Sequence, residues 1–386
     1  MKSVLSERSK LHPLDIERRE LPAEAGYAVR ALAHEICTEL DAAPARPDRA
    51  RTLTDPVLVE RIDARARELP AEVRRALRPP AGPAGAAIVT GLPITDAEFG
   101  PTPSDWREAA GWSCDPARRA RSFEFDIVTL LLGRCAGEPF GWRGQQDGRL
   151  VNNIVPARGH EAEQSGASSE TLLCPHTEDA FHPARSNLLM LVCLRNTDGV
   201  GTTVSSVRRV ELTGEQLRLL AAPTLPILPD VSYGGGHERF DAIPVPTVWS
   251  ESGYSTADLT LRYDPAYTPL DDAGVEFRRA YAHLTMELER VCVTATLDPG
   301  ELLLIDNDVA VHGRVPFTAR YDGTDRWLKR VNIRLPERRR RAAESDENGY
   351  GQQIVAPFPV AVNRRPTGAG AGRETTADER GTVAQP

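Results

Sequence analysis

The chain has 386 residues and a formal net charge of −8, with 40% apolar and 26% charged residues. This is the balance of a soluble globular protein, and its acidic character argues against a nucleic-acid binder, which would usually be basic. No run of 18 apolar residues occurs and the first residues are polar, so we expect no transmembrane helix, no signal peptide and, by default, a cytoplasmic location.

Before residue 150 the apolar residues recur mainly at helical spacing. This spacing predicts helices over 21–42, 55–78 (with a break at Pro70) and 123–132. The Pro/Gly/Ala-rich residues 79–86 form a predicted linker before a short buried strand at 87–90. The polar residues 101–121 are expected to be mostly loop.

From Leu150 onwards, short apolar runs alternate with turn signals. The predicted strands are 151–155, 172–174, 188–194, 202–207, 259–263, 302–305 and 327–335. Helices are predicted at 273–294 and at 213–220, where Thr213 and Gln216 have the spacing of a capping box. Many short strands at irregular spacing are typical of a β-sandwich or jelly roll.

Two features follow the last predicted strand. The basic run Arg338–Arg341 is interpreted as a solvated helix or strand end rather than a nucleic-acid patch, because the rest of the protein is acidic. The residues after about Arg364 have almost no large apolar side chain, so we expect them to be disordered. The six cysteines are scattered without a Cys-x-x-Cys pair, and neither a zinc site nor a disulfide framework is expected.

The motif of greatest chemical interest is His176-Thr177-Glu178, just after a short apolar run. Residues i and i+2 of a β-strand point to the same face, so His176 and Glu178 would reach one point. His312 is the best candidate for a third ligand, since it follows an apolar strand and a polar turn. Two histidines and one carboxylate form the facial triad of non-haem Fe(II) oxygenases. Taken alone, this spacing is also common in ordinary strands.

Two arginines lie downstream of His312 on a strand-like segment. Strand alternation would direct Arg326 and Arg330 to the same side. A guanidinium binds a carboxylate through two parallel hydrogen bonds, so the pair would hold two different carboxylates near a metal. The alternative is a surface strand with solvated arginines.

Specific blocks of sequence surround these residues. They are 145–156 (QQDGRLVNNIVP), 176–183 (HTEDAFHP), 194–196 (LRN), 202–207 (TTVSSV), 261–265 (LRYDP) and the segment 300–334. In content and order they resemble the clavaminate synthase-like Fe(II)/2-oxoglutarate oxygenases, especially the branch that hydroxylates free arginine or asparagine. The resemblance covers about residues 85–336.

The resemblance implies a mainly β fold, a double-stranded β-helix (jelly roll) with flanking helices. It implies a helical extension at 1–83, an oxygenase domain at 84–340 and a C-terminal extension at 341–386. The implied cofactor is Fe(II), with 2-oxoglutarate and O2 as cosubstrates. Its ligands fall on His176, Glu178 and His312, and glutamate as the carboxylate ligand is a habit of this branch.

The same resemblance assigns roles to further residues. Arg326 would form the salt bridge to 2-oxoglutarate, with a hydroxyl contact from Thr203. Gln145 and Arg330, beside Glu178, would bind the α-amino and α-carboxylate groups of the substrate, and Asp264 its side chain.

The remaining histidines and glycines are read more simply. His182 is expected to be structural, and His160, His237 and His283 to lie on the surface or to serve packing. Gly234–Gly236 is not a phosphate loop, because no Lys-Ser/Thr follows it. We interpret it as a mobile segment that closes over the active site as a lid.

The substrate is the least determined part. Asp264 favours a small-molecule amino acid with a basic side chain, but Ala266 stands where arginine-selective relatives carry another acid. Hydroxylation at C3 in specialised-metabolite (antibiotic) biosynthesis is the expectation, with C4 hydroxylation and desaturation left open. Neutral, modified or carrier-tethered amino acids stay as alternatives, as does a cupin-like metal-binding protein without turnover. The oligomeric state is not predicted.

Overall fold

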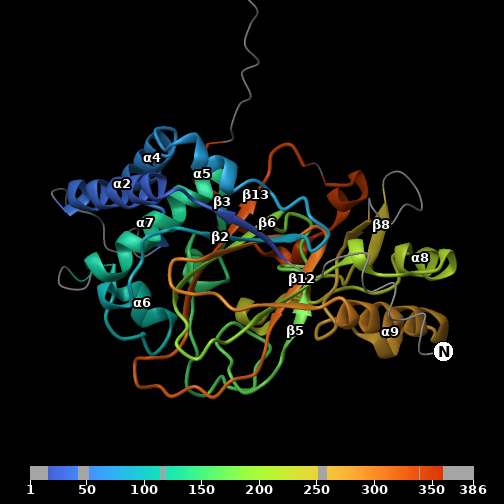
Figure 1. Cartoon of the computed structure of the whole chain (residues 1–386). Coiled ribbons are helices and arrows are strands. Elements are labelled where there is room, and N and C mark those ends of the chain that lie inside the picture. The colour runs from blue at the N-terminus through green and yellow to red at the C-terminus, as the bar shows by residue number, and fades with distance from the viewer. Residues whose placement is uncertain are drawn as a thin grey trace, which may run out of the picture.

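The computed structural model describes residues 16–41, 52–113, 115, 119–250, 259–338 and 340–359. Its strands form two main sheets (Figure 1). The larger sheet has the order β1 (Glu17–Glu20), β2 (Ala86–Thr90), β11 (Leu302–Asp306), β6 (Leu188–Arg195), β13 (Trp327–Arg334), β3 (Glu138–Trp142), β14 (Ile354–Val355), with β4 (Asn152–Ile154) also paired to β13. The smaller sheet has the order β10 (Val293–Ala295), β7 (Thr202–Ser206), β12 (Ala310–Arg314), β5 (Leu173–His176), and β8 (Val248–Ser250) pairs separately with β9 (Leu259–Leu261).

The central strands of the larger sheet are buried on both faces. In β6, Met190 and Val192 pack in one apolar core, whereas Leu189 and Leu191 pack in another. The same alternation divides the side chains of β11 between the two cores. This explains why these strands read as continuous apolar runs in the sequence, since a strand covered on both faces needs no polar alternation.

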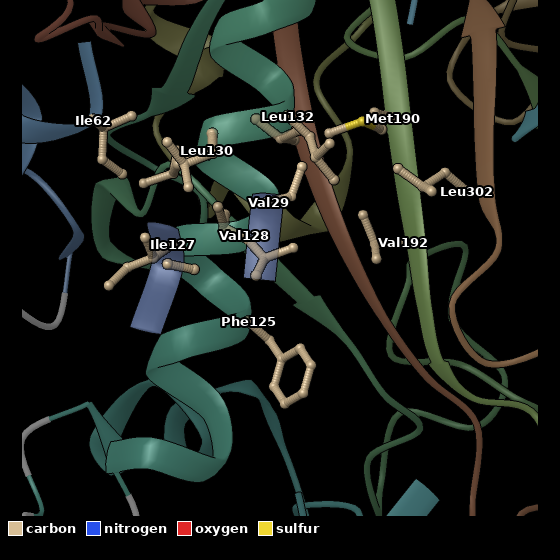
Figure 2. Packing of buried hydrophobic residues seen from close by; sticks show 14 of the residues in the cluster. Val29, Ile62, Phe125, Ile127, Val128, Leu130, Leu132, Met190, Val192 and Leu302 are labelled. Atoms are coloured by element: carbon tan, nitrogen blue, oxygen red, sulfur yellow. The ribbon is translucent and has the colours of Figure 1, made fainter. Parts of the chain in front are cut away.

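Helices cover both sides of the strands (Figure 1). One group comprises α2 (Ala23–Asp41), α4 (Pro56–Arg65), α5 (Ala71–Ala76), α6 (Trp106–Trp112) and α7 (Arg119–Ala136), and the opposite group α8 (Gly214–Ala221) and α9 (Val275–Arg290). Figure 2 shows Val128 and Leu132 of α7 beside Met190 of β6, with Val29 of α2 close by. Short 3-10 turns occupy Asp96–Glu98, Gln146–Gly148, Val207–Arg209, Val231–Tyr233, His237–Arg239, Leu270–Asp272, Ala342–Asp346 and Gly349–Gly351.

Most predicted elements are confirmed. Helices lie at the three N-terminal positions expected, with the break at Pro70 between α4 and α5. The capping box of α8 is present, because Thr213 and Gln216 exchange their side-chain and backbone hydrogen bonds. The predicted disordered tail after Arg364 lies outside the described residues, and none of the described helices is long and apolar enough to span a membrane.

Three predictions about elements are wrong. Residues 101–121 are not mostly loop, because Asp105 caps the N-terminus of α6 by accepting a hydrogen bond from the backbone of Glu108. The helix predicted at 273–294 ends at Arg290, and Val293–Ala295 pair with β7 instead. Strand β3 was missed because its sequence, EPFGW, carries a proline and a glycine that argue against a strand.

Two arginines of the basic run, Arg338 and Arg340, are not simply solvated as predicted. Arg338 binds Asp306 at 2.6 Å and Asp308 at 3.1 Å, and Arg340 binds the other oxygen of Asp308 at 2.5 Å. Both aspartates are buried in the turn between β11 and β12. The run therefore fixes this turn against the C-terminal segment.

A buried charge network joins α7 to the larger sheet. Asp126 is fully buried and forms ion pairs with Arg149 and, at 2.6 Å, with Lys329 of β13. The Lys329 ammonium also lies 3.0 Å from Asn153 Oδ1 in β4. Both cations are shielded from water, so their stability in the fold depends on the Asp126 carboxylate.

We predict that Asp126→Asn lowers the free energy of unfolding by about 3–5 kcal/mol, because it takes from the buried Lys329 ammonium the carboxylate with which it pairs. Urea denaturation of the purified protein measures the change. Glu72→Gln, which removes an exposed ion pair with Arg75, is the control and should cost less than about 1 kcal/mol. Equal effects of the two substitutions would contradict the prediction.

His182 is buried as a neutral hydrogen-bond acceptor, as its expected structural role requires. Its Nδ1 accepts from the backbone N–H of Ala184 at 3.0 Å, and the ring lies 4.5 Å from that of Trp142. Burial lowers the pKa of His182 from its ordinary value of 6.5 to about 4. The folded protein therefore resists protonation at this residue over a range in which the unfolded chain accepts a proton.

We predict that this residue reduces the free energy of unfolding as the pH falls from 6.5 towards 4, by at most about 3 kcal/mol. The variant His182→Gln does not titrate and should show a flatter pH dependence, even if it is less stable at pH 7.5. Urea denaturation of both proteins at several pH values measures the slopes. Parallel profiles would show that His182 does not contribute.

Candidate functional site

The two histidines predicted to bind a metal lie opposite each other in the smaller sheet. His176 ends β5, His312 is central in β12, and the antiparallel register pairs them directly. Opposed residues of antiparallel strands share one face, and the two ring centroids are 4.6 Å apart. His176 donates through Nδ1 to the backbone oxygen of Cys174 at 2.8 Å, which fixes the orientation of the ring.

Glu178 reaches the same point by a different route from the one predicted. Strand β5 ends at His176, so Glu178 is not on a strand and the alternation argument does not apply to it. Instead, the Asn307 side chain accepts from the Glu178 backbone N–H at 2.8 Å and donates to its backbone oxygen at 3.0 Å. Asn307, between the two aspartates of the β11–β12 turn, thus positions Glu178. The polar turn was recognised in the sequence, but its side-chain contact was not.

The carboxylate of Glu178 lies between the two imidazoles. Its Oε2 atom is 3.4 Å from His312 Nε2 and 3.7 Å from His176 Nε2, and although it is buried it accepts no hydrogen bond from the described residues. One ligand atom from each of the three residues falls within 4.8 Å of the others, the one such group in the described part of the chain. A buried carboxylate oxygen facing two imidazole nitrogens fits a divalent first-row metal ion.

The charges of this group are coupled. Burial raises the pKa of Glu178, but the Arg330 guanidinium and the nearby imidazoles outweigh it and hold the pKa well below its ordinary value. Burial lowers the pKa of His176, but Glu178 and Asp264 raise it to about 9. The protein alone therefore keeps a proton beside an ionised carboxylate. A bound divalent cation would replace that proton.

The triad opens into a cavity of about 880 Å³ between the two sheets. His312 and Thr202 come from the smaller sheet, whereas Leu191 and Arg330 come from the larger one. Every residue predicted to bind metal, 2-oxoglutarate or substrate lines this cavity except Thr203.

One end of the cavity carries two buried guanidiniums. Arg326 donates to Thr202 Oγ1 at 2.8 Å, and Arg314 donates to the backbone oxygen of Thr171 at 2.9 Å. In the described part of the chain neither has a carboxylate partner, and the Nε atom of each is buried without a hydrogen bond. Burial lowers the pKa of both to about 10. Such a pair fits an anionic ligand.

The hydroxyl beside Arg326 is not the one predicted. The register pairs Thr202 with Arg314, and Val204 with His312, so Thr202 projects on the face of the histidines. Thr203 is opposite Gly313 and projects on the other face of β7. The prediction of Thr203 was therefore one residue out, an error that in a strand moves a side chain to the opposite face.

Gln145 and Arg330 are brought together next to the triad. Arg330 lies 2.5 Å from Glu178 Oε1 and donates to Gln145 Oε1 at 2.6 Å and to Asn152 Oδ1 at 3.1 Å. Gln145 in turn donates to Ser232 Oγ at 3.2 Å. The guanidinium of Arg330 therefore orients the Glu178 carboxylate and also faces the cavity.

Two half-buried carboxylates, Asp264 and Asp230, also line the cavity, and we call this part its carboxylate end. Burial, together with the charge of Asp230, raises the pKa of Asp264 to about 6. Burial also raises the pKa of Asp230, which accepts a hydrogen bond from the backbone of Ser232 at 2.7 Å. Sequence reasoning missed Asp230, because it lies far from Asp264 in the chain. Asp230 lies shortly before Gly234–Gly236, the segment predicted to be a lid. That position was the one feature of the sequence that could have placed Asp230 near the active site.

The other histidines do not join the triad. The exposed His160 pairs with Glu163 at the rim of the cavity. His283 contacts the backbone oxygen of Glu211, and His237 is partly exposed. These positions agree with the surface or packing roles expected. The five cysteines in the described ranges form no disulfide with one another.

The chain matches the family model of "Taurine catabolism dioxygenase TauD, TfdA family" over residues 122–332. It is 37% identical to an enduracididine beta-hydroxylase of Streptomyces hygroscopicus over 303 residues, covering 72% of this chain and 85% of that protein. It is 33% identical to an L-ornithine/L-arginine 3-hydroxylase of Catenulispora acidiphila over 270 residues, with 65% and 77% covered.

Solved structures extend the comparison. The non-heme iron oxygenase OrfP in complex with Fe and alpha-ketoglutaric acid has a TM-score of 0.66 and 36% identity, covering 82% of this chain and 94% of that one. Asparagine oxygenase in complex with Fe(II), 2S,3S-3-hydroxyasparagine and succinate has a TM-score of 0.68 and 32% identity, with 82% and 93% covered. The chain belongs to the TauD, TfdA family and is an Fe(II)- and 2-oxoglutarate-dependent dioxygenase.

Proposed function

We propose that the protein hydroxylates C3 of a free L-amino acid with a cationic, arginine-like side chain. The observation that carries this proposal is the set of charged groups that lines one cavity. Two guanidiniums that have no carboxylate partner among the described residues and two half-buried carboxylates line the same cavity as the triad. An anionic cosubstrate and a cationic side chain would each meet the opposite charge.

His176, Glu178 and His312 would hold Fe(II). Two imidazoles and a carboxylate on one face leave positions open for ligands, and a bound iron would supply the oxidative chemistry that protein groups lack. Arg326, with Thr202 and Arg314 beside it, would bind the distal carboxylate of 2-oxoglutarate.

Gln145, Arg330 and the Glu178 carboxylate would bind the α-amino and α-carboxylate groups of the substrate. Asp264 and Asp230 would bind its cationic end, because two carboxylates that face one cavity repel each other until a cation neutralises them. Support for an arginine-like substrate comes from the names of the relatives, which act on enduracididine, ornithine and arginine. Asp230 would supply the second acid that Ala266 cannot.

The finer description of the fold belongs to this proposal. The two sheets that line the cavity would constitute a double-stranded β-helix, supported by the relation to the iron oxygenase structures. Residues 1–83 would be a helical extension, residues 84–340 the oxygenase domain and residues 341–386 a C-terminal extension. The contacts of α2 with α7 support an extension that packs on the domain.

The proposal is tested by supplying Fe(II), ascorbate, 2-oxoglutarate and O2 with each L-amino acid, including ornithine and citrulline. We expect succinate release and a mass gain of one oxygen with arginine or another basic amino acid. Arg326→Ala should raise the KM for 2-oxoglutarate roughly 10- to 100-fold, the value of a buried charged contact. Arg320→Ala, which removes an exposed pair with Asp198, is the matched control.

A loss of two hydrogens would identify a desaturase, and turnover of neutral amino acids alone would contradict the proposed substrate class. Silence with every free amino acid would favour a modified or carrier-tethered substrate. An unchanged KM for 2-oxoglutarate in Arg326→Ala would place the cosubstrate elsewhere.

The role of the carboxylate end is tested with arginine and citrulline, which have similar shapes but differ in charge. We predict that Asp264→Asn lowers the ratio of kcat/KM for arginine over citrulline roughly 10- to 100-fold, because it removes a buried counter-charge. Asp271→Asn, an exposed acid on the same segment, should leave the ratio unchanged. Equal losses on both substrates would make Asp264 a structural residue.

A further inference from the structure

Residues 230–240, here called the lid segment, cover one side of the cavity. Asp230 and Ser232 line the cavity, whereas the Tyr233 ring is buried among aromatic side chains. Its centroid is 4.8 Å from that of Phe181 and 6.2 Å from that of Trp142. Beyond Tyr233 the segment is largely exposed and glycine-rich. A Cβ atom at Gly234 would meet no described atom within 4 Å. Tyr233 is the buried anchor of the segment, whereas Phe240 contacts Gly351 and the His237 ring lies 6.4 Å from that of Tyr350 nearer the surface.

The anchor has a polar contact next to the triad. The Tyr233 hydroxyl donates to Oδ1 of Asp179, the residue after Glu178. The other oxygen, Oδ2, accepts from Trp142 Nε1 at 2.7 Å and from Asn332 Nδ2 at 3.3 Å. Both oxygens are therefore satisfied, and the partner of Oδ1 comes from the lid segment. If Tyr233 left, a buried carboxylate oxygen would lose its hydrogen bond.

Asp179 has a backbone conformation that makes this contact matter for Glu178. Its φ of 55° lies in the left-handed region, which non-glycine residues adopt uncommonly, although aspartate does so more often than most. The three hydrogen bonds to its carboxylate help to hold the residue in this conformation. The turn at Asp179 immediately follows Glu178 and so helps to determine how the Glu178 carboxylate is presented to the two imidazoles.

A second contact connects the lid segment to Glu178 from the other side. Ser232 accepts from Gln145, Gln145 accepts from Arg330, and Arg330 pairs with Glu178. Consecutive lid residues thus touch both the neighbour of Glu178 and the chain of contacts to its ion-pair partner.

We infer that Tyr233 is a positioning residue that couples the seating of the lid segment over a bound amino acid to the orientation of Glu178. This inference rests on the proposed function. Asp230 and Ser232 line the substrate end, so a bound amino acid stabilises the segment in the seated position. Tyr233 then completes the hydrogen bonds of Asp179, and decarboxylation of 2-oxoglutarate is tied to the presence of substrate.

The test uses the full-length iron-loaded enzyme and the amino acid that the wild type hydroxylates. Tyr233→Phe keeps the ring and removes the hydroxyl. We expect its KM for the amino acid to rise about 10-fold or more, the value of a buried hydrogen bond to a charged group. We also expect more succinate than hydroxylated product, whereas the wild type forms them in equal amounts.

A measurement without turnover accompanies these assays. Hydrogen–deuterium exchange without O2 compares the backbone of the lid segment with and without the amino acid. We expect strong protection on binding in the wild type and a loss of most of that protection in Tyr233→Phe. Tyr350→Phe is the control, because its buried hydroxyl in the same aromatic cluster makes no hydrogen bond to the described residues. It should behave as the wild type in all three measurements.

A double-mutant cycle with Asp179→Asn distinguishes a direct coupling between Tyr233 and Asp179 from a general loss of structure. Non-additive effects of Tyr233→Phe and Asp179→Asn on the succinate-to-product ratio support a direct coupling, and additive effects overturn it. Equal succinate and product in Tyr233→Phe, with the wild-type KM and protection, also overturns the inference. A wild type that hydroxylates no amino acid refutes the proposed function itself, so the two failures are distinguishable.

Discussion

The chemistry of this protein depends on one buried carboxylate whose surroundings keep it ionised. Glu178 is removed from water, which would favour its neutral form, and the Arg330 guanidinium and two imidazoles reverse that preference. Its backbone is held by Asn307, and Asn307 is held between Asp306 and Asp308, which the C-terminal arginines neutralise. The position of Glu178 thus depends on contacts with residues far from it in the sequence, and those residues are held in turn by ion pairs with the C-terminal arginines.

The smaller sheet holds the two histidines of the triad at a constant distance from each other. Directly opposed positions in β5 and β12 give His176 and His312 a separation that the backbone hydrogen bonds maintain. The larger sheet contributes Arg330 through β13 and is stiffened from behind by α7 and the Asp126 network. In the proposed site, strands would carry most of the groups that bind the metal and 2-oxoglutarate, whereas the part that would bind the substrate includes the lid segment. This division is suited to an enzyme that must admit and release an amino acid.

Local patterns in the sequence predicted a large part of this arrangement. The apolar runs of β6 and β11 and the capping box of α8 follow from residue order. The grouping of His176, Glu178 and His312 was predicted from their residue types and from the family resemblance, whereas the route by which Glu178 reaches the histidines was not. The errors have physical causes. Thr203 was chosen over Thr202 because strand register decides the face and is not visible in one sequence. Asp230 and Asn307 were missed because their roles come from tertiary contacts. The arginines at 338 and 340 looked solvated, since buried aspartates about 30 residues away leave no local signal.

The contrast between these inner arginines and the outer ones has a consequence for ionic strength. Arg338 and Arg340 pair with buried carboxylates, which dissolved ions screen weakly, whereas the pairs on α4 and α5, such as Arg75 with Glu72, are exposed. Added salt would therefore loosen the outer helical layer before it disturbed the turn that holds Glu178. The geometry around Glu178 should therefore be less sensitive to ionic strength than the packing of the outer helices.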